Sequence, residues 1–187
     1  MAAAERALSP FEPVSRGHSR SERALVREAA RGSEPALDEL FRRCWPGAYR
    51  AAFLIVHDHA AAEDIAQEAL VAAVRNLSRF DRRRPLTPWL HRIVVNRAID
   101  WTRVRRLRAE VLEEPQHEEA AELGAAAGDP VRIALRALPV EQRAVVVLRH
   151  LLGYMPGEIA RMLEIPRGTV NSRLRRALDE LQEQLER

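Results

Sequence analysis

The sequence predicts an all-α protein: two small helical domains joined by an acidic, flexible linker, the second containing a helix-turn-helix. Three observations carry this prediction. Apolar residues recur at three- and four-residue spacing, and 47% hydrophobic content with only 5% aromatics suits helices packed through Ala, Leu and Val. Charge changes sign sharply near residue 109. Towards the C-terminus, two short helical patterns flank a turn that contains a proline.

Charge and composition also set the domain boundaries. The stretch from Arg79 to Arg108 holds ten arginines against two acids, whereas residues 109–129 hold seven acids and no arginine. The acidic stretch also contains glycines and an alanine run, which is typical of an extended linker. The expected units, in order, are a mobile N-terminal tail (1–21), a helical domain (22–108), the linker (109–130) and a second helical domain (131–187).

The first domain begins with two helical patterns. The first starts near Glu22 and breaks at Gly32, a residue that ends helices readily. The second is expected over residues 35–56, with an apolar face that runs its whole length. Pro46 lies inside this pattern, where it removes a backbone donor and clashes with the preceding turn. We therefore expect Pro46 to bend the helix or split it in two.

A third helix is expected over residues 60–76, with Asp58 as its candidate N-cap. Apolar and small side chains occupy its inner face. Its outer face is acidic and polar and carries Glu63, Asp64, Gln67 and Glu68.

A fourth helix is expected from Pro88 to about Leu107, directly after an arginine-rich loop. The helix can bury Leu90, Ile93, Val94 and Ala98, while its other faces carry Arg92, Asn96 and Arg103. The loop before it carries Phe80, Arg82, Arg83 and Arg84. Basic side chains interleaved with aromatic ones suit a single nucleic-acid strand, whose bases can stack. We expect Trp89 and Trp101 to belong to the core, and the arginine cluster to be functional.

The helix-turn-helix pattern lies in the last quarter of the chain. Residues 158–164 form a short amphipathic pattern, and Pro166 cannot continue it, so the chain turns there and restarts. In the second helix one face should be buried: Val170, Leu174, Leu178, Leu181 and Leu185.

The exposed side of this second helix points to duplex DNA. Near its start it carries Asn171, Ser172, Arg175 and Arg176, and the stretch from Arg167 to Leu178 has four arginines and no acid. Such a surface meets a phosphate backbone without opposing charge.

Other kinds of site find little support. His57, His59 and Glu63 could approach one metal ion, but no fourth ligand is in sight, so a metal site is not expected. Cys44 is the only cysteine and has no histidine or acid partner at helical spacing, which favours a buried small residue over a nucleophile. No glycine-rich phosphate loop or membrane-length apolar run is present, and we expect a cytoplasmic protein that is not an enzyme.

Taken together, these stretches resemble the extracytoplasmic-function group of bacterial sigma factors, the short two-domain members of the sigma-70 family. The similarity covers nearly everything from Leu25 to Leu185, at four places in the family's order. They are residues 63–69, similar to the core-polymerase-binding segment; 87–100, similar to the promoter-melting, −10-reading segment; 138–143, similar to the start of the second domain; and 168–174, similar to the −35-reading helix.

The resemblance implies roles for particular residues. Core RNA polymerase would bind Asp64, Gln67 and Glu68. The −10 element, opened to a single strand, would be held by Phe80, Arg82, Arg83, Arg84, Arg92, Asn96 and Arg103. The −35 duplex would be read by Asn171, Ser172, Arg175 and Arg176, with Arg167 and Arg173 on flanking phosphates. No cofactor is implied, and an anti-sigma factor is a further partner that the resemblance allows.

Two departures from the family pattern stand out. Met155, Pro156 and Gly157 occupy the place where the family usually has a hydroxyl residue and a glutamate, so we expect this helix to lack its usual N-cap. Asn171 occupies a position that is more often basic, so the −35 preference of other members need not apply. The alternative function is a stand-alone helix-turn-helix regulator that binds duplex DNA without polymerase; an enzyme is the more remote one.

Overall fold

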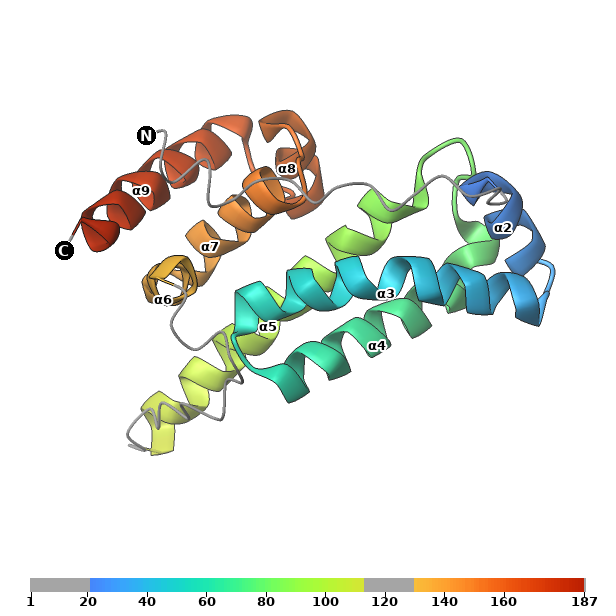
Figure 1. Ribbon diagram of the computed structural model, residues 1–187, viewed down its shortest axis with the longest axis horizontal. Coiled ribbons are helices and arrows are strands. Elements are labelled where there is room, and N and C mark those ends of the chain that lie inside the picture. The colour runs from blue at the N-terminus through green and yellow to red at the C-terminus, as the bar shows by residue number, and fades with distance from the viewer. Residues whose placement is uncertain (1–20, 113–129, 187) are drawn as a thin grey trace.

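The computed structural model describes residues 21–112 and 130–186, and all regular structure within these ranges is helical (Figure 1), which confirms the all-α prediction. The expected tail and most of the expected linker lie outside the described residues. The elements are α2 (Glu22–Ala29), α3 (Glu34–Val56), α4 (His59–Asn76), the 3-10 turn η1 (Leu77–Arg79), α5 (Leu86–Leu112), α6 (Pro130–Ala137), α7 (Val140–Val146), the π-helical turn η2 (Val147–Leu151), α8 (Pro156–Leu163) and α9 (Arg167–Leu185).

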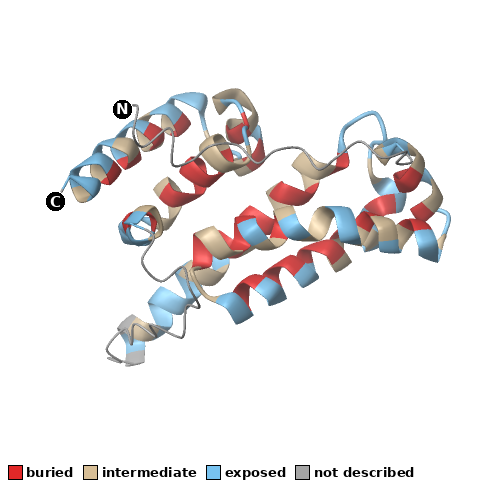
Figure 2. Cartoon of the chain, in the orientation of Figure 1, coloured by how far each residue is buried: buried red, intermediate tan, exposed pale blue. Residues whose placement is uncertain are grey.

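Helices α3, α4 and α5 form the first bundle, with α2 packed on the N-terminal half of α3 (Figure 1). Alanines line much of the contact between them, and small side chains of this kind let helix axes approach closely. Each helix carries a buried stripe, which on α5 ends near Ile99 (Figure 2). α5 continues to Leu112, four residues beyond the boundary expected at residue 108.

Two side chains fix the starts of helices in this bundle. The Asp58 carboxylate accepts a hydrogen bond of 2.9 Å from the Ala61 backbone N–H, which confirms it as the N-cap of α4. The Ser21 hydroxyl accepts one of 3.3 Å from the Ala24 N–H at the start of α2. Ser21 therefore belongs to the folded domain, although it was expected in the tail.

Pro46 does not split α3, contrary to one of the two outcomes expected from the sequence. The helix runs unbroken from Glu34 to Val56, with Pro46 inside it and exposed to solvent. Buried residues lie on both sides of the proline: Leu40 packs in the cluster around α2, and Ala48 in the main core. Burial of both halves of the helix outweighs the loss of one backbone hydrogen bond.

The second half contains α6 to α9, and α8, a tight turn and α9 form the predicted helix-turn-helix. Glu164 ends α8 in the left-handed conformation (φ 56°), and Pro166 immediately precedes α9. The buried face of α9 differs in part from the prediction: it consists of Val170, Leu174, Ala177 and Leu181. Leu178 is half-buried. Leu185 is exposed, because the end of α9 extends beyond the helices that cover the rest of it (Figure 1).

The start of α8 is capped differently from the family pattern. Met155 occupies the N-cap position without a hydroxyl or carboxylate of its own, as expected. The Glu158 carboxylate compensates, because it accepts a 2.8 Å hydrogen bond from the Met155 backbone N–H. Half of a capping box is therefore retained from the helix side.

The two halves of the chain pack against each other. One connected hydrophobic cluster includes residues of α3, α4 and α5 together with residues of α6 to α9. α5 contacts both α7 and α8, and α6 lies against α3 (Figure 1). Across the ranges that the structure covers, no helix combines the length and apolarity that a membrane crossing requires.

Candidate functional site

The outer face of α4 presents the polar side chains predicted to meet a protein partner. Glu63, Asp64, Gln67 and Glu68 are all exposed, and the residues between them are buried in the bundle. The Glu68 carboxylate forms an ion pair with Arg97 of α5. Asp64 and Gln67 therefore lie beside a charged pair that links α4 to α5.

The arginine-rich loop lies between η1 and α5 and is structured by its own polar groups. The Asp81 carboxylate accepts a 3.0 Å hydrogen bond from the Arg83 backbone N–H, and its carbonyl accepts one of 2.9 Å from the Arg84 N–H. The side chains of Arg82, Arg83 and Arg84 are exposed.

An aromatic pair and a carboxylate anchor the ends of this loop. Phe80 packs on Trp89 with ring centroids 4.9 Å apart, and both residues are half-buried. Glu22 of α2 accepts hydrogen bonds from the Leu86 backbone N–H (2.7 Å) and the Thr87 hydroxyl (3.2 Å). Glu22 thus caps α5, a role that sequence analysis missed because the two residues are more than sixty positions apart in the chain.

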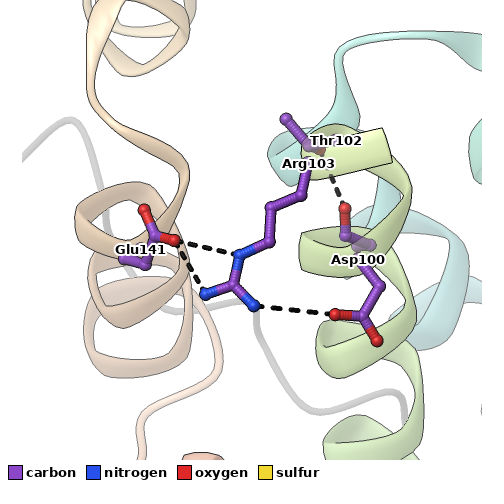
Figure 3. Close-up of polar contacts among 5 residues, drawn as sticks. Asp100, Thr102, Arg103 and Glu141 are labelled. Atoms are coloured by element: carbon purple, nitrogen blue, oxygen red, sulfur yellow. Dashed lines mark hydrogen bonds and ion pairs between the residues drawn. The ribbon is translucent and has the colours of Figure 1, made fainter. Parts of the chain in front are cut away.

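Arg92, Asn96 and Arg103 lie on one side of α5, and that side faces the second half of the protein. Arg92 forms an ion pair with Glu164 at the end of α8. Arg103 donates two hydrogen bonds to the Glu141 carboxylate of α7, 2.8 and 3.1 Å long, while also pairing with Asp100 at 3.7 Å (Figure 3). Asn96 is half-buried between these arginines along the helix.

Glu141 is held in its charged form by this contact. Burial alone would raise the pKa of Glu141, but the hydrogen bond from Arg103, a backbone hydrogen bond and the charges of Arg103 and Arg173 outweigh it, so the pKa is lowered. The carboxylate therefore remains an anion on the arginine of α5.

A buried hydrogen bond joins the halves near the start of α5. His91 Nδ1 and the Tyr154 hydroxyl share a 2.8 Å hydrogen bond. Burial lowers the pKa of His91 to about 4, so the ring is neutral at neutral pH. Gly47 of α3 permits this placement, since a Cβ there would lie only 3.2 Å from His91 Nε2. Sequence analysis did not single out any of these three residues.

Arg143 is a buried cation that ties three segments together. Its guanidinium donates hydrogen bonds to the carbonyls of Leu135 (2.9 Å), Arg136 (2.6 Å) and Leu138 (2.9 Å) at the end of α6, and to the Ile55 carbonyl at the end of α3. Burial lowers the pKa of Arg143 to about 10, with a further contribution from Arg136. The carbonyls at helix C-termini carry partial negative charge, which offsets the desolvation.

The two histidines of the candidate metal trio lie in different surroundings. His59 shares a 2.6 Å hydrogen bond with the Tyr49 hydroxyl and stacks on Phe53. His57 ends α3 with φ 54°, and burial followed by the charges of Arg143, Arg136 and Arg132 lowers its pKa to about 3. Among the described residues no group of metal-ligating side chains comes together. Burial raises the pKa of the Cys44 thiol to about 11, which leaves it protonated and unreactive.

Only some of the α9 residues that were predicted to contact DNA are exposed. Arg167, Asn171, Arg175 and Arg176 are exposed. Ser172 is half-buried, and its hydroxyl donates a 3.0 Å hydrogen bond to the Thr169 carbonyl. Arg173 is half-buried too, close enough to Glu141 for its charge to lower the pKa of that carboxyl.

The sequence matches two protein families along these same segments. Residues 40–108 match Sigma-70 region 2, which covers α4, the arginine-rich loop and most of α5. Residues 130–181 match Sigma-70 region 4, which covers the helix-turn-helix.

Full-length relatives and solved structures agree with these matches. The ECF RNA polymerase sigma factor SigM of Mycobacterium tuberculosis is 39% identical over 165 residues, which are 86% of this chain and 82% of the relative. The structure of CnrH in complex with the cytosolic domain of CnrY has a TM-score of 0.67 at 28% identity, covering 89% of this chain and 98% of that one. The sigma factor RpoE of Bartonella quintana, bound to the anti-sigma factor NepR, has a TM-score of 0.69 at 25% identity, covering 80% and 96%. This chain belongs to the extracytoplasmic-function sigma factors.

Proposed function

We propose that this sigma factor binds core RNA polymerase through α4, holds an opened −10 strand on α5 and the arginine-rich loop, and reads a −35 duplex with α9. One observation carries the proposal: each of these elements has a polar or basic surface at the positions the family pattern specifies, within segments that match regions 2 and 4. The polymerase and −10 sites would belong to the domain over residues 22–108, and the −35 site to the domain over residues 131–187.

The proposed polymerase site consists of Asp64, Gln67 and Glu68. Carboxylates and an amide on a helix with a buried opposite face can pair with arginines of a partner helix. Asp64 and Gln67 are fully available, whereas Glu68 would exchange its ion pair with Arg97 for one with the partner.

The proposed −10 site combines the loop and α5. Phe80 and the exposed Arg82, Arg83 and Arg84 lie on the loop before α5, and Arg92, Asn96 and Arg103 follow along one side of that helix. Arginines would hold the backbone phosphates, and an amide could hydrogen-bond to an extruded base. An extruded base costs a few kcal/mol of stacking and pairing, which such a site offsets.

The proposed −35 site is the exposed surface of α9. Arg175 and Arg176 have the fork geometry that suits guanine, Asn171 suits adenine, and Ser172 can accept or donate at either. Arg167, together with Arg173 if its side chain leaves Glu141, would contact flanking phosphates. The protein would act in the cytoplasm without catalytic chemistry of its own. An anti-sigma factor is the proposed regulatory partner, since the similar RpoE structure is a complex with an anti-sigma factor.

Run-off transcription with purified core RNA polymerase and a pool of genomic promoter fragments tests the function. We expect specific transcripts only when the protein is added, and weak promoter binding by the protein alone. Tight duplex footprints without polymerase, and no transcripts with it, would indicate a stand-alone regulator instead.

The polymerase site has its own test. Asp64→Arg with Gln67→Arg should abolish co-elution with core polymerase, because two exposed acceptor groups become cations. Stability should change by only about 0.5 kcal/mol at such surface positions. Asp38→Arg, an exposed acid on α3 that pairs with Arg42, is the matched control and should leave co-elution intact. Retained co-elution of the double variant would refute the assignment to α4.

A further inference from the structure

The second half of the protein covers the side of α5 that carries its predicted −10 residues. α7 and α8 both contact α5. Glu164 at the end of α8 pairs with Arg92, and Glu141 of α7 pairs with Arg103 (Figure 3). Two acids from one half therefore occupy two arginines of the other, on either side of Asn96.

Carboxylates and phosphates compete for the same arginine side chains. The planar guanidinium fork binds two oxygens of either anion, so an arginine held by a glutamate is not free for a DNA phosphate. The lowered pKa of Glu141 keeps this competing anion charged.

These ion pairs alone would not hold the halves together. The side chains of Arg92 and Glu164 are 43% and 71% exposed, and exposed pairs contribute little. Other contacts supply the rest: the buried His91–Tyr154 hydrogen bond, the buried Arg143 hydrogen bond to the Ile55 carbonyl, and half-buried Arg132 over the Phe53 ring at 5.6 Å. The shared hydrophobic cluster adds to them.

Two polar atoms that are buried in the closed protein lack a hydrogen-bond partner within the described residues. One is His57 Nε2, which lies near the charges of Arg143, Arg136 and Arg132. Gln142 Oε1 on α7 is likewise buried and unpartnered. Water would satisfy such atoms once exposed.

We propose that the free protein is self-inhibited: α7 and α8 close over α5 and place Glu141 and Glu164 on the arginines that hold the −10 strand. Strand binding then requires the halves to separate. The inhibition rests on the proposed −10 role of α5, whereas the closure itself stands on the contacts between the halves.

The first measurement is the distance between the halves in the free, full-length protein. In a Cys44→Ser background, spin labels at Arg75→Cys on α4 and Glu183→Cys on α9, both exposed positions, report it by double electron–electron resonance. We expect one narrow distance for the parent protein, and longer, broader distances for Glu141→Gln with Glu164→Gln and Tyr154→Phe, which loses both ion pairs and the buried hydrogen bond to His91. A broad distribution in the parent that this triple variant leaves unchanged would overturn closure.

The second measurement is binding of a fluorescein-labelled, mixed-sequence single-stranded oligonucleotide, followed by anisotropy. If about a tenth of the parent is open, a variant that is fully open should bind the oligonucleotide with about tenfold higher apparent affinity. Glu34→Gln with Asp38→Asn, exposed acids on α3, gives the same charge change without touching the second half. Tyr154→Phe removes the hydroxyl bonded to His91 without any charge change and should also raise binding.

The combined results separate the possible failures. Opening without a gain in strand binding beyond the α3 control would overturn self-inhibition. A gain that persists when Arg92→Ala and Asn96→Ala are added to the open variant would instead overturn the proposed −10 site, because the freed surface would bind elsewhere. A gain that these two substitutions remove supports both.

Discussion

At the scale of single residues, two buried polar side chains, His91 and Arg143, form hydrogen bonds that join the two halves. Arg143 caps the C-terminal ends of two helices, since its guanidinium donates hydrogen bonds to carbonyls in the last turns of α6 and α3. Its sequence context gives no hint of this, because an arginine on an amphipathic helix usually faces solvent.

Replacing Arg143 tests this role. Arg143→Leu should lower the free energy of unfolding by about 2–4 kcal/mol, because several buried carbonyls lose their donor at about 1–3 kcal/mol each with partial relaxation. Arg136→Leu, whose side chain is exposed, should change it by about 0.5 kcal/mol or less. Urea unfolding of both variants checks this, and equal effects would contradict the role. The pKa of His57 should also rise in Arg143→Leu, since the Arg143 charge helps to lower it.

The buried histidines predict an acid-sensitive fold. Folding lowers the pKa of His57 to about 3 and of His91 to about 4, so in the folded protein both stay neutral well below the ordinary value of 6.5. The unfolded chain binds these protons first, so stability is full above about pH 6.5 and falls as pH drops towards 4. Urea midpoints between pH 7 and 5, above most carboxyl titrations, should show this fall, and His91→Gln should flatten it. A constant midpoint in both proteins would contradict it.

At the scale of elements, we propose that α9 divides its DNA contacts between bases and phosphates. Arg176→Ala should weaken promoter binding by the holoenzyme by about 1–3 kcal/mol and relax base preference at one or two positions. Arg173→Ala should weaken all sequences alike and reduce the salt slope by about one. Binding to a panel of single-base promoter variants at several salt concentrations measures both. Identical losses on every sequence would refute the division.

Helical periodicity predicted the elements well, because each helix buries one face over most of its length. The start of α4 followed from Asp58, whereas the role of Ser21 as the N-cap of α2 was not predicted. Sequence patterns failed where packing against other helices determines whether a side chain is buried or a helix continues. Leu185 lies past the end of the covering helices and stays exposed, and α3 continues through Pro46 because both of its halves are buried.

At the scale of the whole molecule, the sequence predicts two helical units but not how they meet. Resemblance to the family placed the candidate residues on α4, α5 and α9, where the structure finds most of them exposed. The contacts of Arg92 with Glu164 and of His91 with Tyr154 join residues more than sixty positions apart. No local pattern encodes such pairs, since each partner alone reads as an ordinary surface or core residue.

Promoter opening tests the central claim, that this chain is a sigma factor whose α5 captures the −10 strand, most directly. The measurement is permanganate reactivity of unpaired thymines with holoenzyme, on a duplex promoter and on one premelted across the −10 region. Asn76→Ala, an exposed asparagine at the end of α4, is the matched control for Asn96→Ala. We expect Asn96→Ala to assemble into holoenzyme and bind the −35 element normally, to open the duplex less than the parent, and to recover part of its activity on the premelted template, where most of the opening cost is already removed. Equal opening of the duplex by Asn96→Ala and the parent would contradict the claim.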